Sequence, residues 1–233
     1  MQDHLESSGT RILLVRHGET EWNRLHRFQG RSDLPLNQKG RGQGRALALA
    51  LKDEPITAIY SSPLIRAMEM ANLIKVFHPS VPLFEEEGLT EMDLGEYEGM
   101  EAQHWSSQNA AFYRSWLESP ASVRIPGGEN LLEVQDRAIC ALKRITQLHP
   151  PGSTLVLCSH NFVNRTLLCY ALKMPLDRFR EVKQETGALN ILCKHGEKLV
   201  VKVMNECSHL TEDIESGQGS HSGKEVPGSS GSR

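Results

Sequence analysis

The chain has 233 residues, a formal net charge of -3, 39% hydrophobic residues and 24% charged residues. This length suits one domain with a sizeable core, and the weak net charge argues against a global field for binding nucleic acid or an anionic membrane. No apolar run reaches the length of a membrane span, and the N-terminal segment lacks the apolar centre of a signal peptide. The five cysteines are scattered without C-x-x-C spacing, so we expect a cytoplasmic protein whose thiols are reduced and bind no metal.

Short apolar runs alternate with helical periodicity along most of the chain. The apolar runs predict buried strands at Arg11–Val15, Ile56–Ser62, Leu83–Phe84 and Ser153–Ser159. Helical spacing predicts helices in Leu36–Lys52 after its glycines, Pro63–Phe77, Met100–Glu118, Asn130–Leu148 and Phe162–Leu172. Two later runs, Ala188–Cys193 and Lys198–Met204, predict a final hairpin. This alternation predicts an α/β fold with a mainly parallel sheet that is covered on both faces.

The end of the chain has a different composition. From about Glu206 it is rich in glycine, serine and charged residues and has almost no large apolar side chain. Such a segment cannot bury enough apolar surface to offset the entropy that it would lose on ordering. We therefore expect residues 206–233 to form a disordered tail.

Chemically capable side chains follow several of the predicted strands. Arg16 and His17 come directly after the first strand, and His160 follows the strand at Ser153–Ser159. Arg66 lies one helical turn beyond the end of the second strand, and Glu91 follows the short run at Leu83–Phe84. In open α/β sheets, ligands bind beyond the carboxyl ends of the strands. The sequence therefore predicts that these five side chains share one edge of the sheet.

This set of residue types suits phosphoryl transfer. Two guanidinium groups can bind a phosphoryl group through paired hydrogen bonds and offset the charge on its oxygens. A neutral imidazole is a competent nucleophile at phosphorus, and a carboxylic acid can protonate the leaving oxygen and later deprotonate water. No metal-ligand spacing accompanies them, so we expect no metal and no cofactor, with the arginines in the role that Mg²⁺ fills elsewhere.

At these residues the sequence resembles the histidine phosphatase superfamily, also called the phosphoglycerate mutase-like family. The similarity covers roughly Arg11 to Val203 and rests on blocks that occur in the family's order. These blocks are RHGETEWN (Arg16–Asn23), QGRSDLPLNQKG (Gln29–Gly40), SSPLIRA (Ser61–Ala67), LTEMDLGEYEG (Leu89–Gly99), PGGEN (Pro126–Asn130) and SH before a helix (Ser159–His160). A single R-H-G is a weak signal, whereas these blocks in order are specific.

The resemblance implies a three-layer α/β/α sandwich with a mostly parallel central sheet. The histidine phosphatase domain would span residues 11–205, after an N-terminal extension at residues 1–10. Within it, an insert at about residues 84–130 would partly cover the site and shape its specificity.

The resemblance also implies a role for each matching residue. His17 would be the nucleophile that becomes phosphorylated, and Glu91 would be the proton donor and acceptor. Arg16, Arg66 and His160 would form the rest of the phosphate pocket. The remaining residues expected to contact phosphate or substrate are Asn23, Gln29, Gly30 and Asn161. Asn161 stands where the family often has glycine, so it could narrow the pocket or add a hydrogen bond to the substrate.

Net hydrolysis of a small phosphorylated metabolite is the activity that these features favour. The stretch Glu91–Gly127 is short, contains no lysine and has Arg114 and Arg124 as its arginines, whereas the mutase branch carries a longer and more basic insert. Mutase-type phosphoryl transfer remains the enzymatic alternative, and a non-catalytic module that binds phosphorylated ligands is the other. We expect no nucleic acid or membrane partner; monomer and homodimer both stay open, as does the identity of the phosphate ester.

Overall fold

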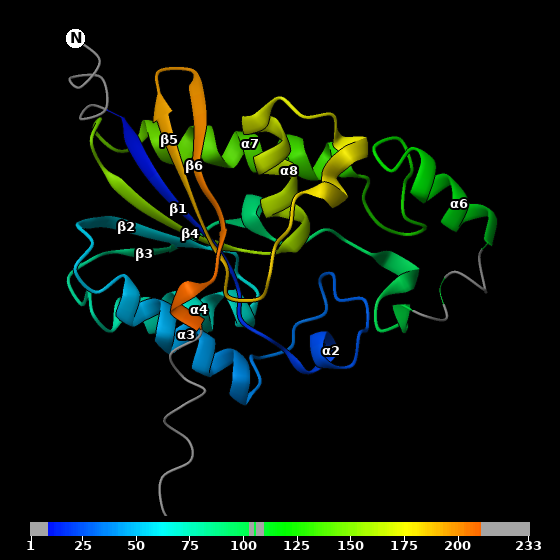
Figure 1. Ribbon diagram of the computed structural model, residues 1–233, viewed down its shortest axis with the longest axis horizontal. Coiled ribbons are helices and arrows are strands. Elements are labelled where there is room, and N and C mark those ends of the chain that lie inside the picture. Colours follow the sequence, from blue (N-terminus) through cyan, green and yellow to red (C-terminus); the bar gives the residue numbers. More distant parts are fainter. Residues whose placement is uncertain (1–8, 103–104, 106–109, 211–233) are drawn as a thin grey trace, which may run out of the picture.

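In the computed structural model, which describes residues 9–102, 105 and 110–210, six strands form one mixed sheet in the order β3-β2-β4-β1-β5-β6 (Figure 1). The strands are β1 (Thr10–Arg16), β2 (Ile56–Ser61), β3 (Leu83–Glu85), β4 (Thr154–Ser159), β5 (Leu189–His195) and β6 (Lys198–Glu206). Strands β3, β2, β4 and β1 run parallel, while β5 pairs antiparallel with β1 and β6 antiparallel with β5. The predicted mostly parallel sheet and the final hairpin are both confirmed.

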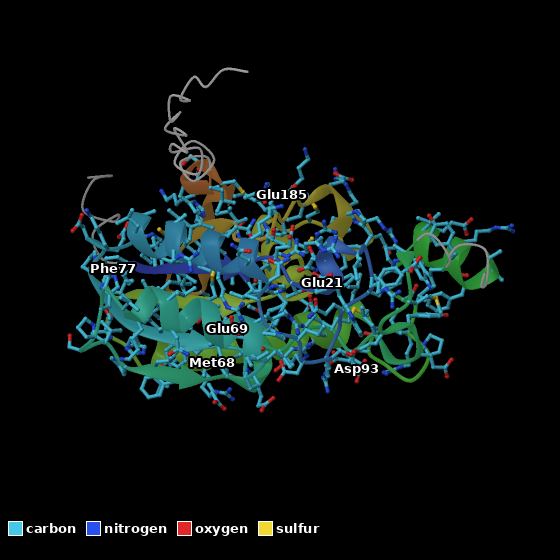
Figure 2. The ribbon with its side chains drawn as sticks, turned by 90° about the horizontal axis from the view of Figure 1, so that it is seen from below. Glu21, Met68, Glu69, Phe77, Asp93 and Glu185 are labelled. Carbon is cyan, nitrogen blue, oxygen red and sulfur yellow. The ribbon has the colours of Figure 1, made fainter. Side chains whose placement is uncertain are left out.

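Helices cover both faces of this sheet, as Figure 1 shows. On one face lie α3 (Gln38–Ala50) and α4 (Ile65–Lys75), and on the other lie α7 (Leu131–Gln147) and α8 (Asn161–Leu172). Figure 2 views the molecule from the side of α3 and α4. The fold is therefore the predicted three-layer α/β/α sandwich.

The alternation of side chains along β1 explains why the layers form on both sides. Ile12 and Leu14 belong to the core that contains α7 and α8, whereas Leu13 and Val15 belong to the core that contains α3 and α4. Successive side chains of a strand point to opposite faces, so an uninterrupted apolar run requires cover on both. Strand β4 has the same character, since all of its residues are buried.

A capping box stands at the start of α7. The Asn130 side chain accepts a hydrogen bond from the Glu133 backbone N–H at 2.9 Å, and the Glu133 carboxylate accepts one from the Asn130 N–H at 3.1 Å. This capping box satisfies two backbone donors that a helix N-terminus otherwise leaves without partners. It fixes where α7 begins, directly after the Pro126–Asn130 block.

Helix α3 begins earlier than the sequence predicts. Asn37 caps it by accepting a hydrogen bond from the Gly40 N–H at 2.8 Å, so the glycines lie inside the helix and not before it. Gly40 is needed there because a Cβ atom would overlap the carbonyl oxygen of Glu19. The strong N-cap and this close approach together override the low helix propensity of glycine.

The predicted helix over Met100–Glu118 is confirmed in part: Ala102, Trp105 and Ala110–Glu118 are helical, whereas Met100 and Glu101 are not. Helix α6 spans Ala110–Glu118, and Glu101 instead forms an isolated bridge with Arg27. Residues 103–104 and 106–109 of that prediction lie outside the described residues. Helix α6 extends away from the sheet at one end of the molecule (Figures 1 and 2).

The C-terminal boundary differs from the prediction as well. Strand β6 continues through Glu206, and a 3-10 helix, η4 (Ser208–Leu210), follows it. The His209 ring Nε2 lies 3.0 Å from the Gly187 carbonyl oxygen, which ties η4 to the loop before β5. Residues 206–210 of the predicted tail are therefore structured, and its remaining residues, 211–233, lie outside the described residues. None of the described helices has both the length and the apolar character of a membrane span.

Candidate active site

The pairing of β1 with β4 brings two histidines to one edge of the sheet. Arg16 is paired with Ser159 in the parallel ladder, and the His17 N–H donates a hydrogen bond to the Ser159 carbonyl at 3.0 Å. His160 is the N-cap residue of α8. The rings of His17 and His160 consequently lie 5.1 Å apart between centroids, at an interplanar angle of 58°.

His17 is held with one ring nitrogen committed to the backbone. Its Nδ1 lies 2.7 Å from the carbonyl oxygen of Gly18, and because a carbonyl can only accept, Nδ1 carries the hydrogen. The lone pair of the neutral ring is then on Nε2. Burial lowers the pKa of His17 well below its usual range, and the nearby charges of Arg66 and Arg16 lower it further. His17 is therefore neutral at physiological pH, with a nucleophilic nitrogen available.

His160 is held differently. Its Nε2 lies 2.7 Å from the Ser62 hydroxyl, which itself accepts a hydrogen bond from the Leu64 N–H at 3.3 Å. The hydroxyl hydrogen is thus free to point at Nε2, which leaves a hydrogen on Nδ1. That Nδ1 is buried and has no hydrogen-bond partner among the described residues. Burial, followed by the charge of Arg66, lowers the pKa of His160, so the ring is a neutral donor.

Two arginines stand beside the histidines with part of each guanidinium unused. Arg66, which is fully buried, donates to the Ser32 carbonyl at 2.9 Å and to the Gly30 carbonyl at 2.7 Å. Arg16 donates to the Gln184 carbonyl. The Nε atoms of both arginines are buried without a partner among the described residues. Buried donors are almost always satisfied, so an anion is the natural partner for these groups.

Both arginines keep their charge at neutral pH. Burial lowers the pKa of Arg16 to about 10, against the opposing influence of Glu91. Burial likewise lowers the pKa of Arg66 to about 10, again opposed by Glu91. A site with two charged guanidiniums and two neutral imidazoles is therefore built to receive negative charge.

Glu91 supplies the acidic group of this cluster and is 2% exposed. Its Oε1 accepts hydrogen bonds from the Met92 N–H at 2.9 Å and from the Phe162 N–H at 3.2 Å. Burial is the largest influence on this carboxyl and raises its pKa, although these hydrogen bonds and Arg66 oppose the shift. A carboxyl with a raised pKa remains protonated at higher pH and can act as a general acid.

The loop that carries Glu91 is fastened to α7 by Arg137. Its guanidinium donates to three carbonyls of the loop, those of Gly88 at 3.1 Å, Thr90 at 2.5 Å and Glu91 at 3.1 Å. It also pairs with the Glu129 carboxylate, which in turn accepts a hydrogen bond from the Asp93 N–H at 2.9 Å. The backbone is thus tied on both sides of Glu91.

The remaining residues expected at the site fall into two groups. Asn23 forms a capping box with Thr20 at the start of α2 (Glu21–Arg24), and the Gly30 carbonyl holds Arg66, so both support their neighbours. Gln29 accepts a hydrogen bond from the Thr20 hydroxyl at 2.5 Å, which leaves its buried Nε2 without a partner among the described residues. Asn161, the first residue of α8, has a buried Oδ1 that is equally unpartnered there. Gln29 and Asn161 therefore offer free polar atoms.

Several residues that support the site could not be identified from the sequence alone. Ser62 lies in the SSPLIRA block, which resembles the family, but its contact with His160 could not be predicted because the two residues are 98 positions apart. Gln184 binds Arg16 through its backbone carbonyl. Any residue has such a carbonyl, so the residue type at position 184 does not indicate this contact. Arg137 is one of several charged residues on α7, and nothing in its local sequence distinguishes it from the others.

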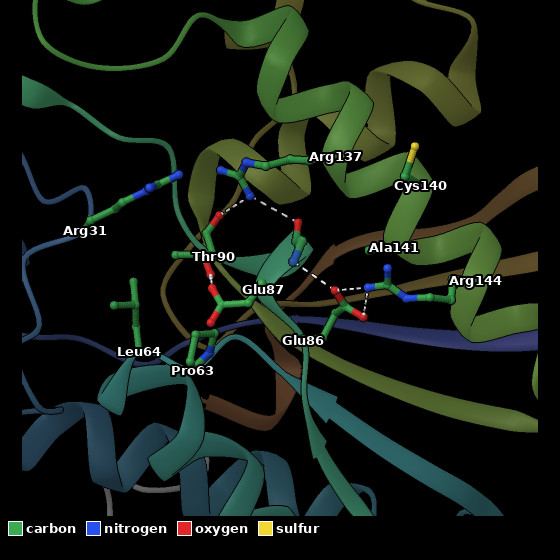
Figure 3. A pocket seen from close by; sticks show the side chains of 11 residues that line it. Arg31, Pro63, Leu64, Glu86, Glu87, Thr90, Arg137, Cys140, Ala141 and Arg144 are labelled. Atoms are coloured by element: carbon green, nitrogen blue, oxygen red, sulfur yellow. Dashed lines mark hydrogen bonds and ion pairs between the residues drawn. The ribbon is translucent and has the colours of Figure 1, made fainter.

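A pocket of about 530 Å³ is lined by residues of the loop that precedes Glu91, among them Glu87 and Thr90, and by residues of α7, among them Arg137 and Arg144 (Figure 3). Its arginines are each paired with a carboxylate: Arg31 and Arg137 with Glu129 at 3.3 and 2.9 Å, and Arg144 with Glu86 at 2.5 Å. None of the catalytic candidates lines it. The pocket thus lacks the unsatisfied donors that mark the site around His17. Among the described residues, no group of His, Cys, Asp and Glu is arranged to hold a metal ion.

Comparison with known proteins gives a consistent result. The family model of the histidine phosphatase superfamily (branch 1) matches residues 12–207. Phosphoserine phosphatase 1 of Hydrogenobacter thermophilus is 30% identical over 206 residues, which cover 87% of this chain and 95% of that protein. Phosphoglycerate mutase-like protein 4 of Arabidopsis thaliana is 34% identical over 203 residues, covering 86% and 87%. The solved structure of Bacillus stearothermophilus YhfR superposes with a TM-score of 0.81 at 30% identity, covering 86% and 99%.

Proposed function

This chain belongs to the histidine phosphatase superfamily, branch 1, and on that premise we propose that it hydrolyses a small phosphorylated metabolite through a phosphohistidine on His17. The observation that carries this proposal is the contact between His17 Nδ1 and the Gly18 carbonyl, which leaves Nε2 as the free nucleophile beside two arginines. The tautomer also distinguishes His17 from His160, whose free nitrogen carries a hydrogen.

In the first step, Nε2 of His17 attacks phosphorus and the ester P–O bond breaks. The leaving oxygen takes its proton from Glu91, whose raised pKa suits a general acid. The products of this step are the alcohol, a phosphorylated His17 and an ionised Glu91. In the second step, Glu91 accepts a proton from water as that water attacks phosphorus, which releases inorganic phosphate and restores His17 and Glu91.

The charge that develops on the phosphoryl oxygens is met by fixed donors. The Nε–H groups of Arg16 and Arg66 and the Nδ1–H of His160 are buried without a partner among the described residues, the charges of both arginines act on His17, and the ring of His160 lies 5.1 Å from that of His17. Donors that are already oriented cost no reorganisation during the reaction, and they act strongly where water is excluded. Because these groups supply the positive charge, we propose that turnover requires no divalent cation.

The arginines of the insert favour hydrolysis over mutase-type transfer. In the mutase branch, basic residues of a longer insert hold the second phosphoryl group. Arg124 is instead engaged by the Gly128 carbonyl and by Glu133, and Arg114 lies exposed on α6. The names of the relatives include both activities, so an assay with 3-phosphoglycerate must accompany the phosphatase assays.

The test is the loss of turnover and of the covalent intermediate in His17→Ala. We expect p-nitrophenyl phosphate hydrolysis in this variant to fall at least about a thousandfold, since the nucleophilic route is removed. Rapid quenching of wild type with phosphorus-labelled substrate should trap a base-stable, acid-labile phosphoenzyme that His17→Ala lacks. His26→Asn, at an exposed histidine with a positive φ that asparagine tolerates, is the matched control.

The proposed role of the arginines also predicts that turnover does not depend on a metal ion. Wild-type turnover should persist in excess chelator because arginine, and not a bound cation, neutralises the phosphoryl group. Substantial hydrolysis by His17→Ala, or loss of wild-type activity on chelation that Mg²⁺ restores, would overturn it.

A further inference from the structure

We propose that Arg165 binds a carboxylate of the substrate, so that the preferred substrates are phosphate esters of carboxylic acids. This inference rests on the proposed phosphatase function and adds a specificity-determining residue to it. It is carried by an arginine at the edge of the catalytic cluster whose guanidinium no described residue engages.

Arg165 belongs to the same helix that begins at His160. It lies four residues after Asn161 on α8, so the two residues share one face of the helix. Long side chains on a helix lean toward its N-terminus, which directs the Arg165 guanidinium back toward the first turn. That turn carries the Phe162 N–H that holds Glu91. The charges of Glu91 and Arg16 interact with that of Arg165, which agrees with a guanidinium at the edge of the phosphoryl site.

The guanidinium of Arg165 has no protein partner among the residues that the structure describes. Its Nε is buried and unsatisfied, and none of the hydrogen bonds or ion pairs formed by the described residues involves it. The neighbouring Arg180 provides a contrast, since its Nη2 donates to the Trp116 carbonyl at 2.7 Å. Both arginines lie over the ring of Phe179. They differ in that Arg180 has a hydrogen-bond acceptor in the protein and Arg165 has none among the described residues.

An aromatic wall fixes Arg165 in this orientation. Its guanidinium carbon is 5.7 Å from the centroid of Phe179, and Phe179 stacks on Phe162 with centroids 5.8 Å apart. A cation on an aromatic face is held without losing any of its hydrogen-bond donors. Arg165 is half-buried, so its charge is only partly screened by water and can select for an anionic group.

The charges at the site leave room for one more negative group. Arg16, Arg66 and Arg165 bring three positive charges, and Glu91 is uncharged while it serves as the acid. The phosphate of a monoester carries about two negative charges when fully ionised. A substrate with one additional carboxylate balances the three guanidiniums. The charges of Glu185 and Arg180 also act on Arg165: Glu185 raises the pKa of Arg165 and Arg180 lowers it.

Asn161 fits between the two anionic ends. Its buried Oδ1 has no partner among the described residues and lies one helical turn closer to His160 than Arg165 does. An acceptor in this position suits a hydroxyl or ammonium group on the carbon next to the carboxylate. Phosphorylated hydroxy acids and phosphorylated amino acids both have this arrangement.

Two pairs of esters that differ at the carboxylate test the proposal. The first pair is O-phosphoserine and O-phosphoethanolamine, and the second is 3-phosphoglycerate and glycerol 3-phosphate. We expect wild type to have the higher kcat/KM for the carboxylate member of at least one pair. Arg165→Met should lower that kcat/KM by about 50-fold, mainly through KM, because truncating a charged partner typically costs this much. The loss for the member without the carboxylate should be at least about tenfold smaller, and Arg165→Lys should recover part of the preference.

Arg180→Met is the matched control because it removes the same charge from the same aromatic ring. Inhibition of p-nitrophenyl phosphate turnover by inorganic phosphate shows that each variant keeps a folded phosphoryl site. Equal losses for both members of a pair, equal effects of Arg165→Met and Arg180→Met, or no carboxylate preference in a wild type that hydrolyses p-nitrophenyl phosphate would overturn the role of Arg165. A wild type that hydrolyses no phosphate ester would overturn the proposed function itself.

Discussion

Arg137 and Glu129 form a two-point ion pair behind the loop that carries Glu91, with Nε–Oε1 and Nη2–Oε2 distances of 2.9 and 3.0 Å. Their side chains are 21% and 16% exposed, so water screens the pair only in part. Between them they hydrogen-bond the backbone at Thr90, Glu91 and other positions along the loop. This ion pair makes the position of Glu91, the proposed acid, depend on α7, a helix that carries none of the five catalytic candidates.

Replacing Arg137 should therefore impair proton transfer more than phosphate binding. We expect Arg137→Met to lower kcat about 10- to 100-fold for an alkyl phosphate, because a shift of about an ångström in a catalytic group has effects of this size. The loss with p-nitrophenyl phosphate should be much smaller, since p-nitrophenolate leaves without help from an acid. Steady-state kinetics with both substrates measure the difference.

Arg144→Met is the control for this variant. Arg144 lies on the same helix and pairs with Glu86, but it does not contact the backbone beside Glu91. Equal losses on the two substrates, or the same behaviour from Arg144→Met, would show that Arg137 serves stability alone.

The raised pKa of Glu91 predicts how activity depends on pH. The first step needs Glu91 protonated and His17 neutral, and burial moves their pKa values in opposite directions, up for Glu91 and well below the usual range for His17. The kcat/KM for an alkyl phosphate should therefore be highest between the two values and fall as pH rises through the pKa of Glu91. In Glu91→Gln we expect kcat/KM to drop about 100-fold or more and this alkaline limb to disappear.

The same shift has a consequence for stability. Because the pKa of Glu91 is higher in the folded than in the unfolded state, the folded state binds the proton more tightly, and the free energy of unfolding decreases as pH rises from the ordinary to the raised value. Glu91→Gln removes this dependence and keeps an oxygen for the Met92 and Phe162 N–H groups. The variant should be the more stable protein above that window and lose its advantage below it. Urea unfolding at several pH values measures this, and a difference that does not vary with pH would contradict it.

Much of the site follows from the sequence because parallel strands end at a common edge. Arg16, His17 and His160 are adjacent in space because β1 and β4 are neighbouring parallel strands that end at the same level, with Arg16 paired to Ser159. The position of Glu91 could be predicted from its spacing to GEYEG, although its strand is short. Those residues carry their own signals, either an apolar run just before them or a specific block around them.

The rest depends on contacts that no local pattern encodes. Without the family resemblance, the residues alone do not distinguish His17 from His160 as the proposed nucleophile; the physical ground for that choice is the Gly18 carbonyl contact, which depends on ring orientation. Arg137 reaches its carbonyl partners across 46 to 49 residues, and Arg16 reaches Gln184 across 168. The start of α3 was misplaced because glycine propensity is a local quantity, whereas the close approach of Gly40 to Glu19 is a tertiary one.

Gly18 has a structural role in the packing of β1 against α3. A glycine after the nucleophile suggests close approach to phosphate, but a Cβ at Gly18 would overlap the Gly40 carbonyl oxygen in α3. Gly18→Ala should therefore destabilise the protein by about 1–3 kcal/mol through overpacking and displace His17 as the strands adjust. Gly44→Ala is the comparison, since its Cβ would meet the flexible side chains of Leu73 and Met70, which can move, and no backbone atom of another element. Chemical unfolding of both variants measures this, and equal stabilities would contradict it.

The hydroxyl of Ser62 should control which nitrogen of His160 bears the hydrogen. In Ser62→Ala the proton can move to Nε2, which removes the Nδ1–H donor from the phosphoryl site. We expect kcat to fall about tenfold, at the low end for loss of a preorganised donor, and inhibition by inorganic phosphate to weaken. Ser62→Thr retains a hydroxyl and should recover most of the activity. Ser61→Ala is the matched control because that buried hydroxyl donates only to the Ser62 carbonyl, at 2.9 Å. If both alanine variants lose activity equally, the effect is one of packing, and the hydroxyl does not set the tautomer.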